Sequence, residues 1–365
     1  MCALKVDDIL LSNMFEVAVS ELRQCDRPSA AGIAKRLVRC ILHEGELRRD
    51  LIFWPKGFLA LGIEEFAGFS SEGASGPGSL AGSADESEKA ISVLYEFYGP
   101  WIGRGCPVMN VDDCIAGSTM IYLYRRTGDS TLLRGVESIY EFLAGCKRDG
   151  FGALTYQASS KALADGIGQA AFFLYDYAAL TGSDRALRFG EEQVRIFLKN
   201  AMDSGNGLCY HAYQVVDGGV DKLGAVGWGR AVGWLLLGMC RYESLREESD
   251  NLLRRACSFQ RGDGLFSWQL CGEEGPADTS ATSMIAYSSL VSGLGERRCL
   301  EGMVAGILSK VSDDGRVQAV HAECKGLGMY PQRFAHLPFG QGIALAAVSL
   351  ACRKGLVVPQ AKGVS

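Results

Sequence analysis

Several patterns that would assign a protein to a well-known class are missing from this sequence. None of its 13 cysteines is spaced as Cys-x-x-Cys, and the odd, scattered set favours reduced thiols over a disulfide framework. No apolar run approaches the roughly 20 residues of a membrane span. The formal net charge of -5 includes no basic excess that would attract nucleic acid or an anionic membrane. These absences are typical of a soluble globular protein.

The N-terminus also lacks the pattern of a secretory signal. The first residues, MCALKVDDILLSNMFEVAV, place acids inside the apolar stretch, and no small-residue cleavage site follows. We expect a first helix here. Together with the scattered thiols, this predicts a cytoplasmic protein.

What the sequence does contain is a repeat. Six stretches rich in Gly, Ala and Ser are apolar nearly all round. They start at Lys56 (KGFLALGIEEF), Asp113 (DCIAGSTMIYLYRRTGD), Asp165 (DGIGQAAFFLYDYAALTGSD), Gly229 (GRAVGWLLLGMCRYESL), Ala281 (ATSMIAYSSLVSGL) and Gly340 (GQGIALAAVSLACRKG). The starts are separated by 57, 52, 64, 52 and 59 residues. A period of this length indicates a stacked or circular array of supersecondary units.

Helices of a second kind lie between these stretches. LLRGVESIYEFLAGC from Leu132 and ALRFGEEQVRIFLKNA from Ala186 each carry one apolar stripe and one charged face. A helix that is apolar all round is buried on every side, whereas an amphipathic helix buries one face. Their alternation predicts an inner and an outer ring of six helices each, an all-α (α/α)6 barrel.

Short turn signals connect the two kinds of helix. Asp-Gly or Asn-Gly occurs at Asp149, Asn206, Asp263 and Asp314, each between an outer helix and the next inner one, and predicts tight turns or short hairpins. The Gly/Ser-rich stretch 70–88 has no periodicity and predicts a flexible loop. Because the repeat continues across it, we expect residues 1–365 to form a single domain.

In such a barrel the inner helices run in the same direction, so their N-termini share one mouth. The polar residues expected there are Asp112, Asp113, Asp165, His211, Arg230, Asp278 and Thr279. The flat side chains available to sugar rings are Trp54, Tyr210, Trp228, Trp234 and Trp268. Helix N-termini favour an anionic substrate, and an arginine such as Arg230 can hold a carboxylate with two hydrogen bonds. The simpler alternatives are helix caps for Asp165 and Asp113 and structural roles for His211 and Arg230.

The chain resembles the unsaturated glucuronyl and rhamnogalacturonyl hydrolases, glycoside hydrolase families 88 and 105. The resemblance runs from about Trp54 to Leu350 and rests on five motifs in order. They read VDDCIAGSTMIYLYRRTGD, LADGIGQAAFFLYDYAALTGSD, GLCYHAY, GWGRAVGW and DTSATSMIAYSSL. It implies an (α/α)6 barrel that removes a 4,5-unsaturated uronic acid from the end of a lyase-cut oligosaccharide.

The resemblance also implies roles for particular residues. The catalytic aspartate falls in LADG, hence Asp165, and its companion falls in VDD, hence Asp113 or, as the second choice, Asp112. His211 and Arg230 correspond to substrate contacts, and Trp54, Trp228 and Trp234 would line the same mouth. No cofactor or metal is implied, and we expect a monomer or homodimer.

Three alternatives stay beside this interpretation. Leu163, and Ala231-Val232 within the run Arg230 to Trp234, depart from the family pattern and favour a sugar-binding protein with an altered site. The stretch His321 to Cys324 could supply two zinc ligands. GIGQAA from Gly166 matches a dinucleotide fingerprint, but no alternation of strands and helices surrounds it.

Overall fold

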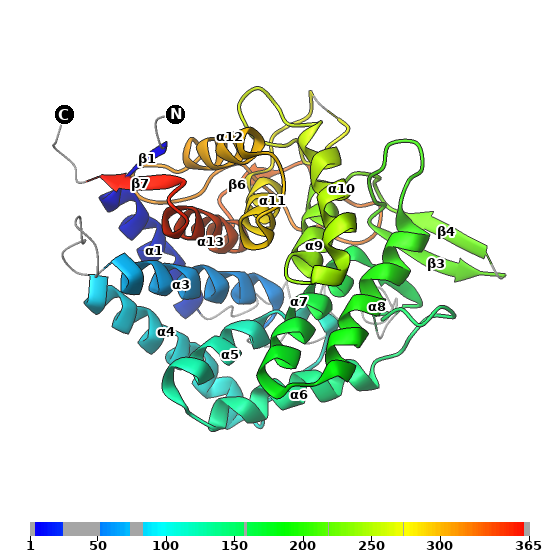
Figure 1. The fold of residues 1–365 in the computed structure, drawn as a ribbon, viewed down its shortest axis with the longest axis horizontal. Helices are drawn as coiled ribbons and strands as arrows, with labels where there is room; N and C mark the ends of the chain where they lie inside the picture. Colours follow the sequence, from blue (N-terminus) through cyan, green and yellow to red (C-terminus); the bar gives the residue numbers. More distant parts are fainter. Residues whose placement is uncertain are drawn as a thin grey trace, which may run out of the picture.

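The computed structural model describes residues 4–24, 52–73, 83–156, 159–217, 219–272 and 274–360. Its helices form two concentric rings (Figure 1). The inner ring consists of α3 (Trp54–Gly73), α5 (Ala116–Thr127), α7 (Ala164–Thr181), α9 (Gly229–Met239), α11 (Thr279–Ser292) and α13 (Pro338–Arg353). Each inner helix packs on the next, and α13 packs on α3 to close the ring. The predicted (α/α)6 barrel is therefore confirmed, and this closure supports our proposal that the chain is one domain.

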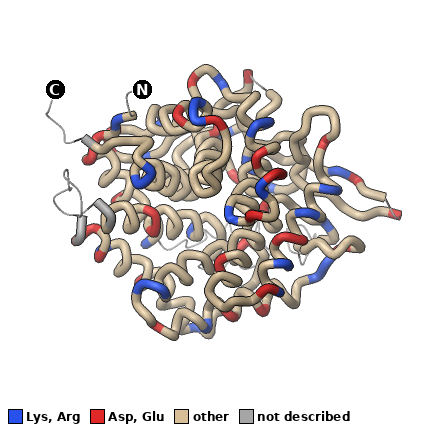
Figure 2. Tube along the Cα trace, viewed as in Figure 1, with Lys and Arg blue, Asp and Glu red and all other residues tan. Residues whose placement is uncertain are grey.

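The outer ring alternates with the inner one along the chain. It consists of α1 (Asp8–Arg23), α4 (Ser83–Gly103), α6 (Thr131–Gly145), α8 (Asp184–Ala201), α10 (Arg246–Cys257) and α12 (Arg297–Leu308). Two short 3-10 helices, η1 (Val111–Asp113) and η2 (Glu243–Leu245), precede α5 and α10. Acidic and basic residues are interspersed along the outer helices and loops, while the inner helices carry few of either (Figure 2). This division follows from the apolar and amphipathic patterns of the two helix types.

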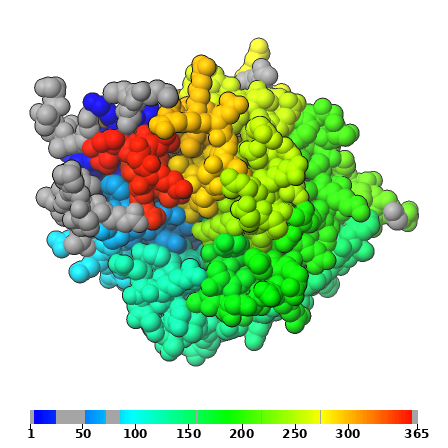
Figure 3. Space-filling model, in the orientation of Figure 1, coloured from blue at the N-terminus to red at the C-terminus, as the bar shows by residue number. Residues whose placement is uncertain are grey.

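Glycine explains how the inner helices pack so closely. A Cβ at Gly62 would lie 2.4 Å from the carbonyl oxygen of Gly342, and one at Gly168 would lie 2.2 Å from that of Trp234. The backbones of α3 and α13, and of α7 and α9, are therefore in direct contact. In the space-filling view the face shown is closed by atoms, with no opening through the ring (Figure 3).

The strands are short and lie at the ends of the barrel. Strand β1 (Leu4–Asp7) pairs in parallel with β7 (Val357–Gln360), and β2 (Lys161–Leu163), β3 (Ala212–Val216) and β4 (Gly219–Leu223) form an antiparallel sheet in that order. Strands β5 (Val320–His321) and β6 (Phe334–Ala335) make a third pair. The N-terminal helix predicted by the sequence is thus preceded by a strand, which brings the start of the chain to its end (Figure 1).

The connections between helices agree in part with the turns and the loop that the sequence predicts. Isolated bridges Arg148–Leu154, Met202–Cys209 and Val311–Val317 close tight hairpins around three of the Asp-Gly or Asn-Gly turns. The flexible loop predicted at 70–88 is shorter at both ends, because α3 continues to Gly73 and α4 begins at Ser83; residues 74–82 lie outside the described residues. Among the described residues, no helix has the length and apolar character that a membrane crossing requires.

The cysteines differ from the expectation of reduced thiols. Cys257, the last residue of α10, forms a disulfide with Cys299 in α12, and their Cα atoms are 6.1 Å apart. Eight further cysteines of the described residues are free thiols. The pairing follows from the barrel, which sets consecutive outer helices side by side although the two cysteines are 42 residues apart.

Charged side chains also occur inside the ring, towards the C-terminal ends of the inner helices. Glu65 of α3 accepts a hydrogen bond from the Tyr287 hydroxyl at 2.7 Å and pairs with Arg353 at 2.8 Å. Its neighbour Glu64 accepts one from the Thr119 hydroxyl at 2.7 Å. The Glu64 side chain keeps a small exposed surface although it lies inside the ring. Burial, followed by the charge of Glu65, raises the pKa of the Glu64 carboxyl to about 8.

Candidate active site

Asp165 is the second residue of α7, at the mouth of the barrel. The N-cap of this helix is Leu163, which provides no side-chain hydrogen bond, so Asp165 is not the helix cap. Its side chain is 18% exposed, and its buried Oδ1 has no hydrogen-bond partner in the structure. A buried carboxylate oxygen without a hydrogen bond is unusual, since buried polar atoms are almost always paired, and it favours a functional role for Asp165.

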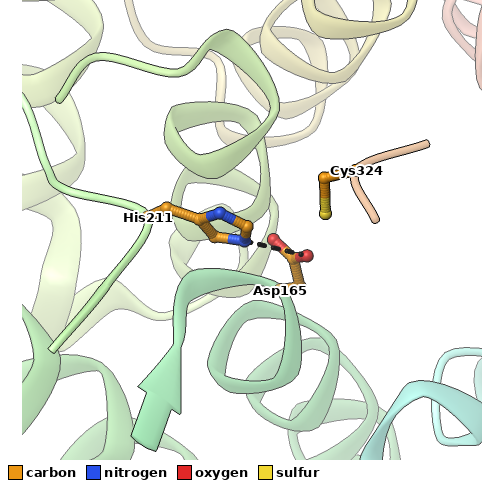
Figure 4. Close-up of side chains that lie close together, drawn as sticks. All are labelled: Asp165, His211 and Cys324. Atoms are coloured by element: carbon orange, nitrogen blue, oxygen red, sulfur yellow. Dashed lines mark ion pairs between the residues drawn. The ribbon is translucent and has the colours of Figure 1, made fainter. Parts of the chain in front are cut away.

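His211 lies beside Asp165 and is fully buried (Figure 4). Its Nε2 is 3.5 Å from Asp165 Oδ2, and its Nδ1 is 2.9 Å from the Tyr330 hydroxyl oxygen. That oxygen also accepts a hydrogen bond from the backbone N–H of Ala225 at 2.9 Å. The carbonyl of His211 accepts the N–H of Ala164 at 2.9 Å, so its backbone supports the start of α7. Together these contacts fix the imidazole with Nε2 directed at the carboxylate.

The two neighbouring aspartates of VDD have different environments. Asp113 is 1% exposed, and its Oδ2 accepts the backbone N–H groups of Met109 and Asn110 at 3.0 and 3.1 Å. With the Asn110 side chain it forms the capping box of η1. The sequence pattern favours Asp113 as the companion carboxylate, whereas these bonds give it a structural role in the loop, as a cap.

Asp112 is the carboxylate that faces the Asp165 helix. Its Oδ1 accepts hydrogen bonds from the Tyr156 hydroxyl at 2.5 Å and from Gln169 Nε2 at 3.1 Å. Gln169 follows Asp165 by one helical turn. Burial raises the pKa of Tyr156 well above its usual range, and the charges of Asp112 and then Asp165 raise it further. The phenol therefore stays protonated, and the sequence's second choice of companion contacts the helix that carries Asp165.

Tyr156 was not identified from the sequence. It reaches the site because the next residue after Asp165 is a glycine: a Cβ at Gly166 would lie 2.9 Å from the Tyr156 ring. Tyrosine in an irregular segment carries no periodic signal, so this contact depends on the fold.

Arg230 is not available to a substrate. It is 1% exposed, donates hydrogen bonds to the carbonyl oxygens of His321 and Ala322 at 2.7 and 2.9 Å, and lies 3.6 Å from the buried carboxylate of Asp278. Its guanidinium also lies 4.8 Å from the centre of the Trp228 ring. The predicted carboxylate contact is thus replaced by a structural one, in which Arg230 links α9 to β5 and the N-terminus of α11.

Most of the predicted stacking residues are also buried. Trp228 and Trp234 are 1% and 2% exposed, and Trp54 is 8% exposed. Trp234 stacks on Phe58 with ring centres 4.8 Å apart, and Trp54 meets it edge to face at 6.0 Å. Trp54 and Trp234 therefore pack inside the barrel, and Trp228 packs against the His211 ring, with ring centres 4.2 Å apart. Partly exposed aromatic side chains include Tyr156, Tyr330, whose hydroxyl contacts His211, and Trp268, whose ring lies 5.6 Å from that of Tyr330.

Cys324 is a further side chain at the site. It lies in the segment after β5, and its Sγ, a ring nitrogen of His211 and a carboxylate oxygen of Asp165 all lie within 4.8 Å of one another (Figure 4). Burial and the Asp165 charge raise the pKa of the thiol to about 12. His321, the other member of the alternative zinc pair, lies between Trp268 and Phe334, and burial, followed by the charge of Arg230, lowers its pKa to about 4.

Comparison with known proteins agrees with this architecture. The chain is 25% identical over 317 residues to the unsaturated rhamnogalacturonyl hydrolase YesR of Bacillus subtilis, covering 80% of this chain and 87% of YesR. It superposes on a possible member of glycoside hydrolase family 105 from Klebsiella pneumoniae with a TM-score of 0.74, 17% identity and coverage of 94% and 92%. It also superposes on an unsaturated glucuronyl hydrolase from Streptococcus agalactiae with a TM-score of 0.64 and 14% identity. This superposition covers 95% of this chain and 93% of the hydrolase.

The family model for Glycosyl Hydrolase Family 88 matches residues 81–353, which span five of the six inner helices and carry Asp112, Asp165 and His211. This match covers most of the chain. The chain therefore belongs to Glycosyl Hydrolase Family 88 and is a glycoside hydrolase.

Proposed function

We propose that this protein removes a 4,5-unsaturated uronic acid from the non-reducing end of a lyase-generated oligosaccharide. The proposal is supported by the activities for which YesR and the structurally similar glucuronyl hydrolase are named. It is also supported by the site, which presents two carboxylates on neighbouring elements at the mouth of the barrel. The observation that carries it is the Asp165 side chain, which is partly exposed and serves as no helix cap.

Asp165 is the proton donor in this proposal. The double bond between carbons 4 and 5 is an enol ether, so carbon 4 is nucleophilic and accepts the Asp165 proton. The positive charge that develops at carbon 5 is shared with the ring oxygen. Water then adds at carbon 5 and returns one proton to the Asp165 carboxylate, so the enzyme is restored. The resulting hemiketal opens, and the aglycone leaves as an alcohol without direct attack at the anomeric carbon.

The neighbouring groups position the donor and the water. His211 holds the Asp165 carboxylate from one side, with its own ring oriented by Tyr330. Asp112 is oriented by Tyr156 and by Gln169 of the helix that carries Asp165, and in this proposal it accepts a hydrogen bond from the attacking water. In ordinary glycosidases two carboxylates act across the glycosidic bond. Here one acid is sufficient because the vinyl ether already carries the reactivity.

Unsaturated disaccharides from pectin, glycosaminoglycan and ulvan digests, each paired with its saturated counterpart, test the proposal. Turnover should remove the ultraviolet absorbance of the conjugated acid, and in heavy water the product should carry deuterium at carbon 4. The saturated uronides should not be cut. Release of sugar from a saturated uronide, or product without deuterium at carbon 4, would replace hydration with conventional hydrolysis. Binding of the disaccharides without any turnover would instead support the alternative of a sugar-binding protein.

A further inference from the structure

The mouth of the barrel contains one more reactive side chain than the proposed reaction uses. Cys324 has no part in protonating a double bond, yet its sulfur is grouped with the donor atoms of Asp165 and His211 (Figure 4). Within the described part of the chain, these three residues form the group of His, Cys, Asp or Glu side chains that lie close enough together to hold a metal ion. The three residues come from separate segments: the start of α7, the residue before β3 and the loop after β5.

Two buried atoms in this cluster make no hydrogen bond. His211 is fully buried, and its Nε2 contacts Asp165 Oδ2 at 3.5 Å without a hydrogen bond; Asp165 Oδ1 has no hydrogen-bond partner either. A fully buried imidazole nitrogen that faces other metal-binding atoms and makes no hydrogen bond favours a ligand at this position, since such atoms are rarely left without one. The substrate can satisfy the carboxylate, but the inward-facing nitrogen and sulfur favour a ligand that accepts electron pairs.

The donor set selects the kind of ligand. A thiolate, an imidazole and a carboxylate are the ligands of Zn²⁺, whereas Mg²⁺ and Ca²⁺ take oxygen donors. Three protein ligands leave a fourth position open to water, as in zinc sites that exchange ligands. Thiolate and imidazole also bind Co²⁺, which can report on the site by its colour.

The distances are close to those of a zinc site. Tetrahedral ligands with bond lengths of ~2.0 to ~2.3 Å lie roughly 3.3 to 3.8 Å from one another. Asp165 Oδ2 and His211 Nε2 are already 3.5 Å apart. The longest separation within the cluster is at most 4.8 Å, so the Cys324 sulfur has to move by about 1 Å, which a side-chain rotation in a loop provides.

The surroundings of His211 resemble the outer shell of a metal site. A ligating histidine usually binds an oxygen through its second ring nitrogen, which fixes the ring. Here Nδ1 contacts the Tyr330 hydroxyl oxygen at 2.9 Å, and the Ala225 N–H holds that oxygen. This arrangement fixes the ring in the orientation that directs Nε2 at the other two donors.

We propose that Asp165, His211 and Cys324 form a reversible Zn²⁺ site, and that the bound ion switches the hydrolase off. Binding exchanges the thiol proton of Cys324, released to solvent, for a sulfur–zinc bond. It also occupies the Asp165 oxygen that would carry the proton for carbon 4, and that proton is released to solvent as well. The inhibition rests on the proposed function of Asp165, whereas the binding of the metal does not.

Binding is tested on the full-length protein after dialysis against a chelator. Titration with Co²⁺ should saturate at one ion per chain and give the near-ultraviolet band of a cobalt–thiolate bond, and Zn²⁺ should displace it. Cys324→Ser should abolish the band and weaken Zn²⁺ binding by at least about tenfold, because even the loss of an outer-shell partner typically costs about 10- to 100-fold in metal affinity. Cys271→Ser removes another free thiol that is not fully buried and should leave the band intact. No thiolate band in the wild-type protein, or a band that survives in Cys324→Ser, would overturn the site.

Inhibition is measured separately, with each variant compared with its own metal-free rate on an unsaturated disaccharide. Zn²⁺ should inhibit the wild type at the concentration that fills the site, with recovery on adding chelator. Cys324→Ser should need at least about ten times more Zn²⁺, in line with its weaker binding. Equal inhibition of both proteins, or activation by Zn²⁺, would overturn the switch. If no unsaturated sugar is turned over, the proposed function fails while the cobalt titration still decides the metal site.

Discussion

His211 Nε2 and Asp165 Oδ2 face each other across 3.5 Å, with His211 fully buried and Asp165 partly open to the mouth of the barrel. The imidazole is fixed through Tyr330, so the pair holds one carboxylate in a defined position without capping the helix that carries it. From this relationship we predict that the loss of Asp165 is the most costly to turnover.

Asp165→Asn should lower kcat by about 10²- to 10⁴-fold, the usual contribution of a general acid, because the amide has no proton to give to carbon 4. The melting temperature should change little, since Oδ1 has no hydrogen-bond partner to lose. Asp184→Asn is the matched control, with an exposed carboxylate in the first turn of the outer helix α8. A folded Asp165→Asn protein that keeps more than about a tenth of the rate would show that the donor lies elsewhere.

Asp112 and Asp113 should separate activity from stability. Asp112→Asn should reduce kcat, because it removes the second charge at the site, and should leave the loop intact. Asp113→Asn should cost about 0.5 to 2 kcal/mol of stability, as for other lost caps, with a smaller effect on kcat. Steady-state kinetics and thermal unfolding of the two variants, measured side by side, provide the check. The reverse pattern would return the companion role to Asp113.

Much of the fold is predictable because the small-residue repeat has a direct physical cause. Glycines such as Gly62 and Gly168 bring inner helices into backbone contact. Because every second helix of the chain is an inner one, these small residues recur along the sequence at a regular spacing. Asp165 is predictable for a related reason, since it stands at the start of one such helix, in a motif that resembles LADG of the family. No metal was expected at this position, because Cys324 is 159 residues away along the chain.

The roles of the other site residues depend on the directions of their side chains, which the sequence pattern does not determine. Asp112 and Asp113 are adjacent in a 3-10 turn, where successive side chains point about 120° apart, so one reaches Gln169 and the other caps the turn. Arg230 follows a helix N-terminus, as a substrate contact would, yet two carbonyl oxygens of the β5 segment hold it. Both distinctions need the fold.

Arg230→Met should destabilise the protein and should not selectively weaken binding of an anionic sugar. The change leaves the Asp278 carboxylate buried without its cation and frees two carbonyl oxygens, which costs roughly 3 to 5 kcal/mol for a buried pair. Chemical denaturation measures this loss. Arg333→Met is the control, an exposed arginine of the same segment of chain as β6. A stable Arg230→Met protein with a raised KM for anionic sugars only would restore the carboxylate contact.

Gly168→Ala should destabilise the barrel, because the new methyl group would lie 2.2 Å from the Trp234 carbonyl oxygen and would force α7 and α9 apart. Overpacking of this kind typically costs about 1 to 3 kcal/mol. Gly145→Ala, at the end of outer helix α6, is the matched control, since the methyl group that it adds would have no atom within 4 Å. Thermal unfolding should show a loss for the first variant and no loss for the second. Equal stability of the two would mean that the inner helices can separate at little cost.

The buried cluster of α3 should make stability depend on pH through Glu64. Its pKa is about 8 in the folded protein, raised by burial and by Glu65, whereas an unfolded glutamate has a pKa near 4.5. Between these values the folded chain retains a proton that the unfolded chain releases, so unfolding becomes more favourable as pH rises. The slope for this one proton is up to about 1.4 kcal/mol per pH unit. Glu64→Gln keeps an acceptor for the Thr119 hydroxyl and removes the charge, so it should gain stability relative to wild type from pH 5 to pH 8.

Glu65→Gln should instead be less stable than wild type at both pH values, because Glu65 pairs with Arg353 and accepts a hydrogen bond from the Tyr287 hydroxyl. Denaturant midpoints of the three proteins at the two pH values decide the matter, and parallel pH profiles for wild type and Glu64→Gln would show that Glu64 does not titrate in this window.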